Sequence, residues 1–239
     1  AEALRHVGRA AEAREYAERS RVAFEELHDA THLAHSLRLL GHICSELGNS
    51  IEGKRHAAAA LETFRAAGDK LGQAQTEAVL AEIGYLLGDF ESARALVAAG
   101  ERHFASIDQP LGRGQCLLLS SWIEHSEGTT DRSRRLAQEA RNEFERAGYR
   151  LGTAQADVSI AHVEHRLMNF HSSEAGAFEA LQTFDVLRTP RGQAACDRLL
   201  AMIGIDTDDL DMAELHTDRA HKQFVKMGDP WGVMESKLL

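Results

Sequence analysis

Three histidines in the second half of the chain are spaced so that they could act together. His125 and His165 are forty residues apart, and His162 precedes His165 by three residues, which places these two on one face of a helix. Imidazole nitrogens bind zinc, so three converging histidines could hold a metal ion. The chain contains thirteen histidines, however, and coincidental neighbours are common at that frequency. We favour solvated or peptide-contacting histidines and keep a metal site as the weaker alternative.

Motifs for other chemistries are missing. The sequence contains no Walker glycine loop, nucleophile elbow, HExxH motif or paired-carboxylate cleft. The acidic stretch 206–211 lacks the ligand spacing of a calcium loop, so we expect it to cap a helix. Cys44, Cys116 and Cys196 show no CxxC spacing, which indicates reduced thiols in a helical interior without a redox or zinc function. We therefore predict a protein that is not an enzyme and has no cofactor.

Charge and hydropathy narrow the classes of partner. Lys and Arg number 27 against 37 for Asp and Glu, and the resulting formal charge of -10 opposes attraction to nucleic acid and to anionic membranes. The longest apolar runs fall far short of the roughly 20 residues that a bilayer span needs, and no basic-then-apolar leader opens the chain. We expect a cytoplasmic protein that contacts neither nucleic acid nor membrane.

An interval of forty residues organises the whole chain. Phenylalanine recurs at this interval, and glycine follows eight residues after five of the six phenylalanines. All three prolines share one column of the same interval, which marks helix starts, and Asp229 or Thr189 directly before a proline would be the N-cap. A second turn column, as at Leu47-Gly48-Asn49, lies halfway through each interval. We interpret the glycines as serving the turns. The two columns are Phe24, Phe64, Phe104, Phe144, Phe184 and Phe224, then Gly72, Gly112, Gly152, Gly192 and Gly232.

Each interval therefore predicts two helices of about 16 residues that form an antiparallel hairpin. Columns such as Ile43, Ile83, Ile123, Val163 and Ile203 keep one character and indicate packing. The fold class is all-α, a right-handed superhelical solenoid of about five hairpins. We expect one domain over 1–239, cut from a longer multidomain protein, with repeats at 31–70, 71–110, 111–150, 151–190 and 191–230 and partial repeats at 1–30 and 231–239.

One hairpin carries a family pattern. Ala81, the run Gly88-Asp89-Phe90, Ala93 and Gly100 resemble the tetratricopeptide repeat, and the resemblance extends over nearly the whole chain. The forty-residue period is longer than the usual 34 and is similar to the long arrays attached to bacterial signal-transduction ATPases, kinases and transcriptional regulators. The resemblance implies sensing or docking of partners. It also implies that ligands lie on a concave surface lined by the first helix of each hairpin.

The groove implied by the resemblance has two candidate binding features. Gln75, Gln115 and Gln155 occupy one position in successive hairpins at about 10 Å spacing, where their amides could pair with a peptide backbone or simply cap and solvate the helix starts. Trp122 could anchor an apolar residue of a partner or could lean, partly buried, on Leu118. The predicted groove residues are His42, Gln75, Glu82, Tyr85, Gln115, Trp122, His125, Gln155, His162, His165 and Arg198, in an exposed stripe with His35, Arg38, Ala78, Leu118, Val158 and Met202.

These residues predict a binding scaffold. The expected partner is a peptide, a protein segment or another domain of the same parent chain, bound in the groove as part of a regulatory or sensor region of a bacterial signalling protein. Two alternatives remain open. One is a domain that senses a metal ion or small molecule through the histidine cluster, and the other is a module that self-associates through its ends.

Overall fold

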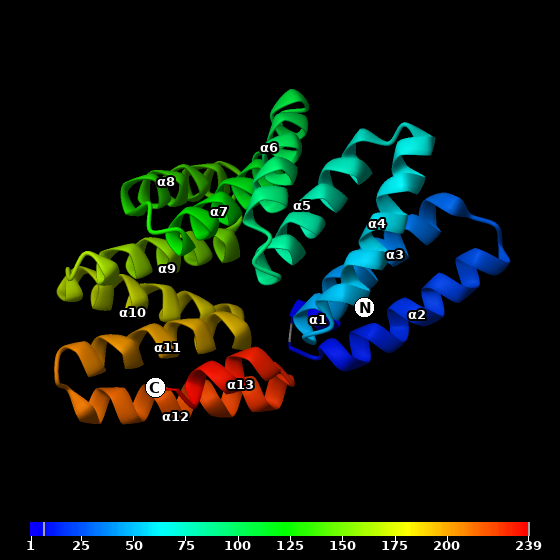
Figure 1. Cartoon of the computed structure of the whole chain (residues 1–239). Coiled ribbons are helices and arrows are strands. Elements are labelled where there is room, and N and C mark those ends of the chain that lie inside the picture. The colour runs from blue at the N-terminus through cyan, green and yellow to red at the C-terminus, as the bar shows by residue number, and fades with distance from the viewer. Residues whose placement is uncertain (7, 239) are drawn as a thin grey trace. The chain divides into compact units, whose positions relative to one another are not determined.

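The protein is described by a computed structural model that covers residues 1–6 and 8–238, and every regular element in these ranges is a helix (Figure 1). The predicted all-α class is confirmed. The helices are α1 Glu2–His6, α2 Ala10–Glu26, α3 Ala30–Glu46, α4 Ser50–Ala67, α5 Lys70–Leu86, α6 Phe90–Ser106, α7 Pro110–Ser126, α8 Thr130–Arg146, α9 Arg150–Arg166, α10 Phe170–Leu187, α11 Pro190–Asp206, α12 Leu210–Met227 and α13 Pro230–Ser236.

The contacts between residues divide the chain into two compact units, residues 1–119 and residues 120–239. In unit 1, α3 packs on α4 and α5 packs on α6; in unit 2, α9 packs on α10 and α11 packs on α12. Consecutive helices thus form hairpins, as the forty-residue interval predicts. The single domain over 1–239, its repeat boundaries and the hand of its superhelix stay predictions.

Aspartates begin several helices. The carboxylate of Asp229 accepts a hydrogen bond of 3.0 Å from the backbone N–H of Gly232, which satisfies one of the donors left open at the start of α13. Thr189 also precedes a proline and occupies the N-cap position of α11, but its side chain makes no such bond and donates to the Phe184 carbonyl instead. The predicted cap is therefore confirmed for Asp229 and only the position is confirmed for Thr189.

The five glycines that lie eight residues after a phenylalanine of the forty-residue column do not serve turns, so that part of the interpretation is wrong. Gly192 lies inside α11, and a Cβ atom added there would be 2.3 Å from Cδ1 of Phe184. The phenylalanine ring, which is 1% exposed, lies directly against the backbone of the next helix and leaves no room for a side chain. The same clash would arise at Gly72, Gly112, Gly152 and Gly232 against Phe64, Phe104, Phe144 and Phe224.

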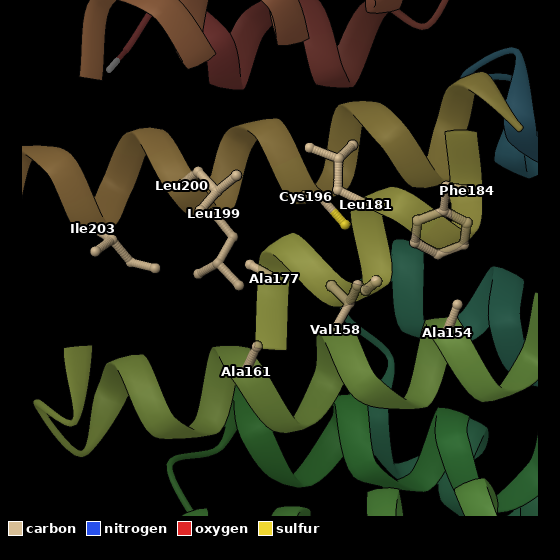
Figure 2. Packing of buried hydrophobic residues seen from close by; sticks show 11 residues of the cluster. Ala154, Val158, Ala161, Ala177, Leu181, Phe184, Cys196, Leu199, Leu200 and Ile203 are labelled. Carbon is tan, nitrogen blue, oxygen red and sulfur yellow. The ribbon is translucent and has the colours of Figure 1, made fainter. Parts of the chain in front are cut away.

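Side chains of three successive helices form the core of unit 2. Figure 2 shows Cys196 and Leu199 of α11 pointing toward Val158 and Ala161 of α9, with residues of α10 beside them. Val158 and Leu118 were expected in the exposed stripe, yet they are only 8% and 3% exposed. That expectation is wrong for these two residues, because their apolar side chains are buried, that of Val158 in the core cluster of unit 2.

The three cysteines are free and buried, as the sequence predicts. Burial is the main cause that raises the pKa of the Cys44 thiol to about 11 and that of Cys116 to about 12, and it raises the pKa of Cys196 further. All three thiols are therefore protonated near neutral pH. In the described ranges, no helix is both long enough and apolar enough to cross a membrane.

Candidate functional site

The partly exposed side of the first helix in each hairpin carries the predicted groove residues. We call this side the first-helix face and define it by His42, Glu82 and Tyr85 in unit 1 and by Trp122, His125, His162, His165 and Arg198 in unit 2. All eight side chains are intermediate in exposure. Each side chain is therefore accessible to a partner and is also partly packed against its own protein.

In unit 1, charged side chains of this face bridge successive first helices. Nη1 of Arg5 on α1 lies 2.9 Å from Oε1 of Glu46 and 3.2 Å from Nε2 of His42, both on α3. Nε2 of His42 also lies 3.0 Å from Oε2 of Glu82 on α5. His42 thus contacts α1 on one side and α5 on the other, so polar side chains connect these three helices.

In unit 2, the three predicted histidines line one pocket of about 300 Å³. The rings of His125 and His162 have centroids 6.1 Å apart, and Nε2 of His165 lies 2.8 Å from Oδ2 of Asp206. The neighbouring Arg198 pairs with Glu235 at 3.3 Å. The structure therefore brings His125, His162 and His165 together, as their spacing predicts. The lining residues are His125, His162, His165, Arg166, Met168, Met202 and Asp206.

The pocket keeps two of its imidazoles uncharged. Burial is the largest cause that holds the pKa of His162 well below its ordinary value of 6.5, and the positive charge of Arg198 adds to the effect. Burial, followed by the charge of Arg166, also lowers the pKa of His125. Near neutral pH each of these rings offers one N–H donor and one nitrogen acceptor to a ligand.

This pKa shift predicts how stability depends on pH. The unfolded chain binds a proton at His162 near pH 6.5, whereas the folded chain binds it only at lower pH. The contribution of His162 to the free energy of unfolding is therefore constant above pH 6.5 and decreases as the pH falls below that value. The slope from this one group reaches at most about 1.4 kcal/mol per pH unit. His162→Met, which introduces the residue found at the matched position 202, is expected to flatten that slope in urea unfolding measured between about pH 7.5 and 5.5.

His171→Gln is the control for this experiment, because His171 is exposed on α10 and its replacement should leave the slope unchanged. An equal slope for wild type and His162→Met would contradict the assignment of the acid sensitivity to His162.

The trio does not have the geometry of a metal site in this structure. Within residues 1–6 and 8–238, the group whose ligand atoms all lie within 4.8 Å of one another is Cys44, Glu52 and His56, and it does not include the three pocket histidines. A metal ion held by His125, His162 and His165 therefore lacks geometric support.

The other predicted groove residues differ in exposure. Gln75 is intermediate, whereas Gln115 and Gln155 are exposed. Trp122 is intermediate and precedes His125 by three residues on α7, which places both side chains on one helical face. The amide ladder and the tryptophan anchor stay predictions.

Sequence reasoning missed three residues that complete the pocket, namely Arg166, Met168 and Asp206, whereas Met202 was already expected in the exposed stripe. Met168 carries the clearest overlooked signal. Its φ of 62° is left-handed, and the matched positions of three other hairpins hold Gly48, Gly88 and Gly128. A methionine in this conformation destabilises the backbone by about 1 kcal/mol or more. Methionine at a position that is glycine in other hairpins therefore indicates that its side chain has a role there.

Comparisons with known proteins agree on the fold. No protein-family model matches the chain, and no curated protein matches its sequence. A Rap protein complexed with Competence and Sporulation Factor has a similar structure, with a TM-score of 0.74 and 14% identity over 84% of this chain and 57% of that chain. The fold is a tetratricopeptide-like helical repeat.

Two further structures resemble this tetratricopeptide-like chain. Aspartyl phosphate phosphatase F from Bacillus subtilis matches with a TM-score of 0.66 and 12% identity, over 89% of this chain and 57% of that chain. A signal-transduction ATPase with numerous domains and a tetratricopeptide repeat sensor, from Pyrococcus horikoshii, matches with a TM-score of 0.58 and 14% identity, over 88% and 36% respectively. The tetratricopeptide-like chain thus spans less than two thirds of each of these three proteins.

Proposed function

We propose that the chain is a non-enzymatic scaffold that binds a peptide or protein segment on the first-helix face. The observation that carries this proposal is the pocket of about 300 Å³ in unit 2, which opens among the predicted groove histidines. The Rap protein complexed with Competence and Sporulation Factor supports it, because a helical repeat of similar fold holds a partner.

The chemistry of the pocket suits a peptide. The uncharged rings of His125 and His162 can donate to a backbone carbonyl and accept from a backbone N–H. The thioethers of Met168 and Met202 are flexible and polarizable, so they can adapt to an apolar side chain. Trp122, one helical turn before His125, would cover that side chain and add apolar contact.

A catalytic role has less support. The name of phosphatase F belongs to that protein, and 12% identity carries the fold without the activity. Nε2 of His165 lies 2.8 Å from Oδ2 of Asp206, and the described residues that line the pocket include no serine, threonine, cysteine or lysine that could act as a nucleophile.

The resemblance to a protein with a repeat sensor supports a regulatory place in a longer protein. The Pyrococcus horikoshii protein carries a tetratricopeptide repeat sensor in a chain with numerous domains, and this chain spans 36% of its length. We infer that the bound segment belongs either to a separate protein or to another domain of the same parent chain, and that its binding controls an output domain in the cytoplasm.

Peptides selected from a displayed random library against the chain test this proposal. Trp122→Ala and His162→Ala are each expected to weaken the selected peptides by about tenfold or more, because truncating a central contact commonly costs over 1 kcal/mol. Arg135→Ala is the control, since Arg135 is exposed on α8, the second helix of its hairpin. Unchanged affinity in both pocket variants, or an equal loss in the control, would contradict binding on the first-helix face.

A further inference from the structure

A second cluster of chemically active side chains lies in unit 1, away from the first-helix face. Cys44 comes from α3, whereas Glu52 and His56 come from α4 of the same hairpin. One ligand atom from each side chain, the thiol sulfur, a carboxylate oxygen and a ring nitrogen, lies within 4.8 Å of the other two. The first-helix face contributes none of these residues.

The close approach of the two helices makes this cluster possible. A Cβ atom added at Gly53 would lie 2.6 Å from the carbonyl oxygen of Gly41, so α3 and α4 touch backbone to backbone at this point. The short side chain of Cys44 can therefore reach across to α4. On α4, Glu52 and His56 are four residues apart and share one face.

Packing alone does not explain the residue types. The position matched to His56 holds Leu96 and Leu136 in the next two hairpins, and the position matched to Cys44 holds Gly84 in the next hairpin. Other hairpins hold different residues at these positions, including Glu124 and Glu164 at the position of Cys44 and His216 at the position of His56. Among the matched positions of the other hairpins, none combines a thiol, a carboxylate and an imidazole as Cys44, Glu52 and His56 do.

These three groups are typical ligands of zinc, which takes Cys sulfur, His nitrogen and Glu oxygen at about 2.0–2.3 Å. Nη2 of Arg14 on α2 lies 2.7 Å from Oε1 of Glu52, which leaves the second carboxylate oxygen for an ion. Hydrogen bonds to ligating carboxylates are common in metal sites and fix their orientation. Arg14 would therefore hold Glu52 in place rather than compete with the ion.

The cluster is also accessible from one side. Cys44 is fully buried, but the side chains of Glu52 and His56 are 38% and 22% exposed. An ion can reach the thiol past these two residues, and a water molecule can complete a four-coordinate shell.

We propose that Cys44, Glu52 and His56 bind one zinc ion, with a water molecule as the fourth ligand. On binding, the sulfur of Cys44 forms a bond to zinc and its proton passes to solvent, which costs affinity because the thiol is otherwise protonated. The ion ties α3 to α4 and stabilises this hairpin. This function is independent of partner binding on the first-helix face.

Cobalt and zinc titrations of the full chain test the proposal. We expect one Co²⁺ ion per chain with a thiolate-to-cobalt charge-transfer band in the near ultraviolet, which Zn²⁺ then abolishes by displacement. His56→Leu should lower zinc affinity by more than about tenfold, the scale on which even outer-shell partners act. It should still fold, because leucine fills the matched positions 96 and 136.

Two cysteine variants separate this site from adventitious binding by the other histidines. Cys44→Ala should abolish the charge-transfer band, whereas Cys196→Ala should keep it, because Cys196 is an equally buried free thiol in unit 2. Absence of the band in the wild-type chain, its persistence in Cys44→Ala, or an unchanged zinc affinity in His56→Leu would overturn the proposal.

Discussion

Phe184→Ala is expected to lower the free energy of unfolding by about 3–5 kcal/mol, the usual cost of truncating a fully buried phenylalanine. The ring is 1% exposed and belongs to the core cluster that joins α9, α10 and α11 (Figure 2). It lies against the backbone of α11 at Gly192, which cannot move in to fill the space because its own helix is fixed by the same core. The loss would appear in the midpoint of urea unfolding.

Val186→Ala is the control on the same helix, because Val186 is 68% exposed and its truncation should change stability by no more than about 0.5 kcal/mol. A double-mutant cycle then tests the contact itself. Gly192→Ala alone should destabilise by about 1–3 kcal/mol, since its Cβ would meet the ring at 2.3 Å. In the Phe184→Ala background, Gly192→Ala should leave the free energy of unfolding unchanged, because the new methyl group occupies the space that the ring has left. Additive losses would contradict the predicted contact.

This contact also shows what the sequence could predict about the fold. The forty-residue spacing of Phe184 with its counterparts predicts repeated hairpins, because equal intervals place equal side chains at equal positions along stacked helices. The role of Gly192 could not be inferred in the same way. A glycine near a turn usually relieves backbone strain, and only coordinates reveal that a ring from the preceding helix occupies the place of its side chain.

The candidate sites divide along a similar line. His125 and His165 could be paired from sequence because they are forty residues apart, and the structure places them in one pocket. The contact of Asp206 with His165 could not be predicted from the sequence. Asp206 lies at the end of the following first helix, forty-one residues after His165, and this one-residue offset from the repeat depends on how the hairpins are staggered. Cys44 and His56 were missed because they face each other across one hairpin, with a spacing that matches no known metal motif.

The largest electrostatic effect is expected at Asp197, whose carboxylate is fully buried between α11 and α12. It lies 2.7 Å from Nδ1 of His216, which is itself 4% exposed, and 3.3 Å from Nε of Arg219. Asp197→Leu should lower the free energy of unfolding by about 1–3 kcal/mol, because it leaves a buried imidazole without its acceptor. His216→Leu should cost a similar amount, since it leaves the buried carboxylate with the partly exposed Arg219 and a long hydrogen bond of 3.4 Å from Nε2 of Gln223.

The chain itself indicates how to remove both losses. The position matched to Asp197 holds Leu37 and Leu117 in other hairpins, and the position matched to His216 holds Leu96 and Leu136. The double variant Asp197→Leu with His216→Leu should therefore be within about 1.5 kcal/mol of the wild type, because a well-packed apolar pair can replace a buried hydrogen-bonded pair. Arg219 is 42% exposed and can turn to solvent.

Asp157→Leu is the matched control for Asp197. Asp157 occupies the same position one hairpin earlier, but its side chain is 31% exposed and its partner Arg141 is 35% exposed, so its loss should cost about 1 kcal/mol or less. Equal losses at Asp157 and Asp197, or a double variant as unstable as the sum of the single variants, would show that burial of the pair does not set its energy. In the expected pattern each single leucine variant is destabilised and the double variant is not. The pair of Asp197 and His216 would then make the packing of α11 on α12 specific, because a leucine on one helix is tolerated only with a leucine on the other.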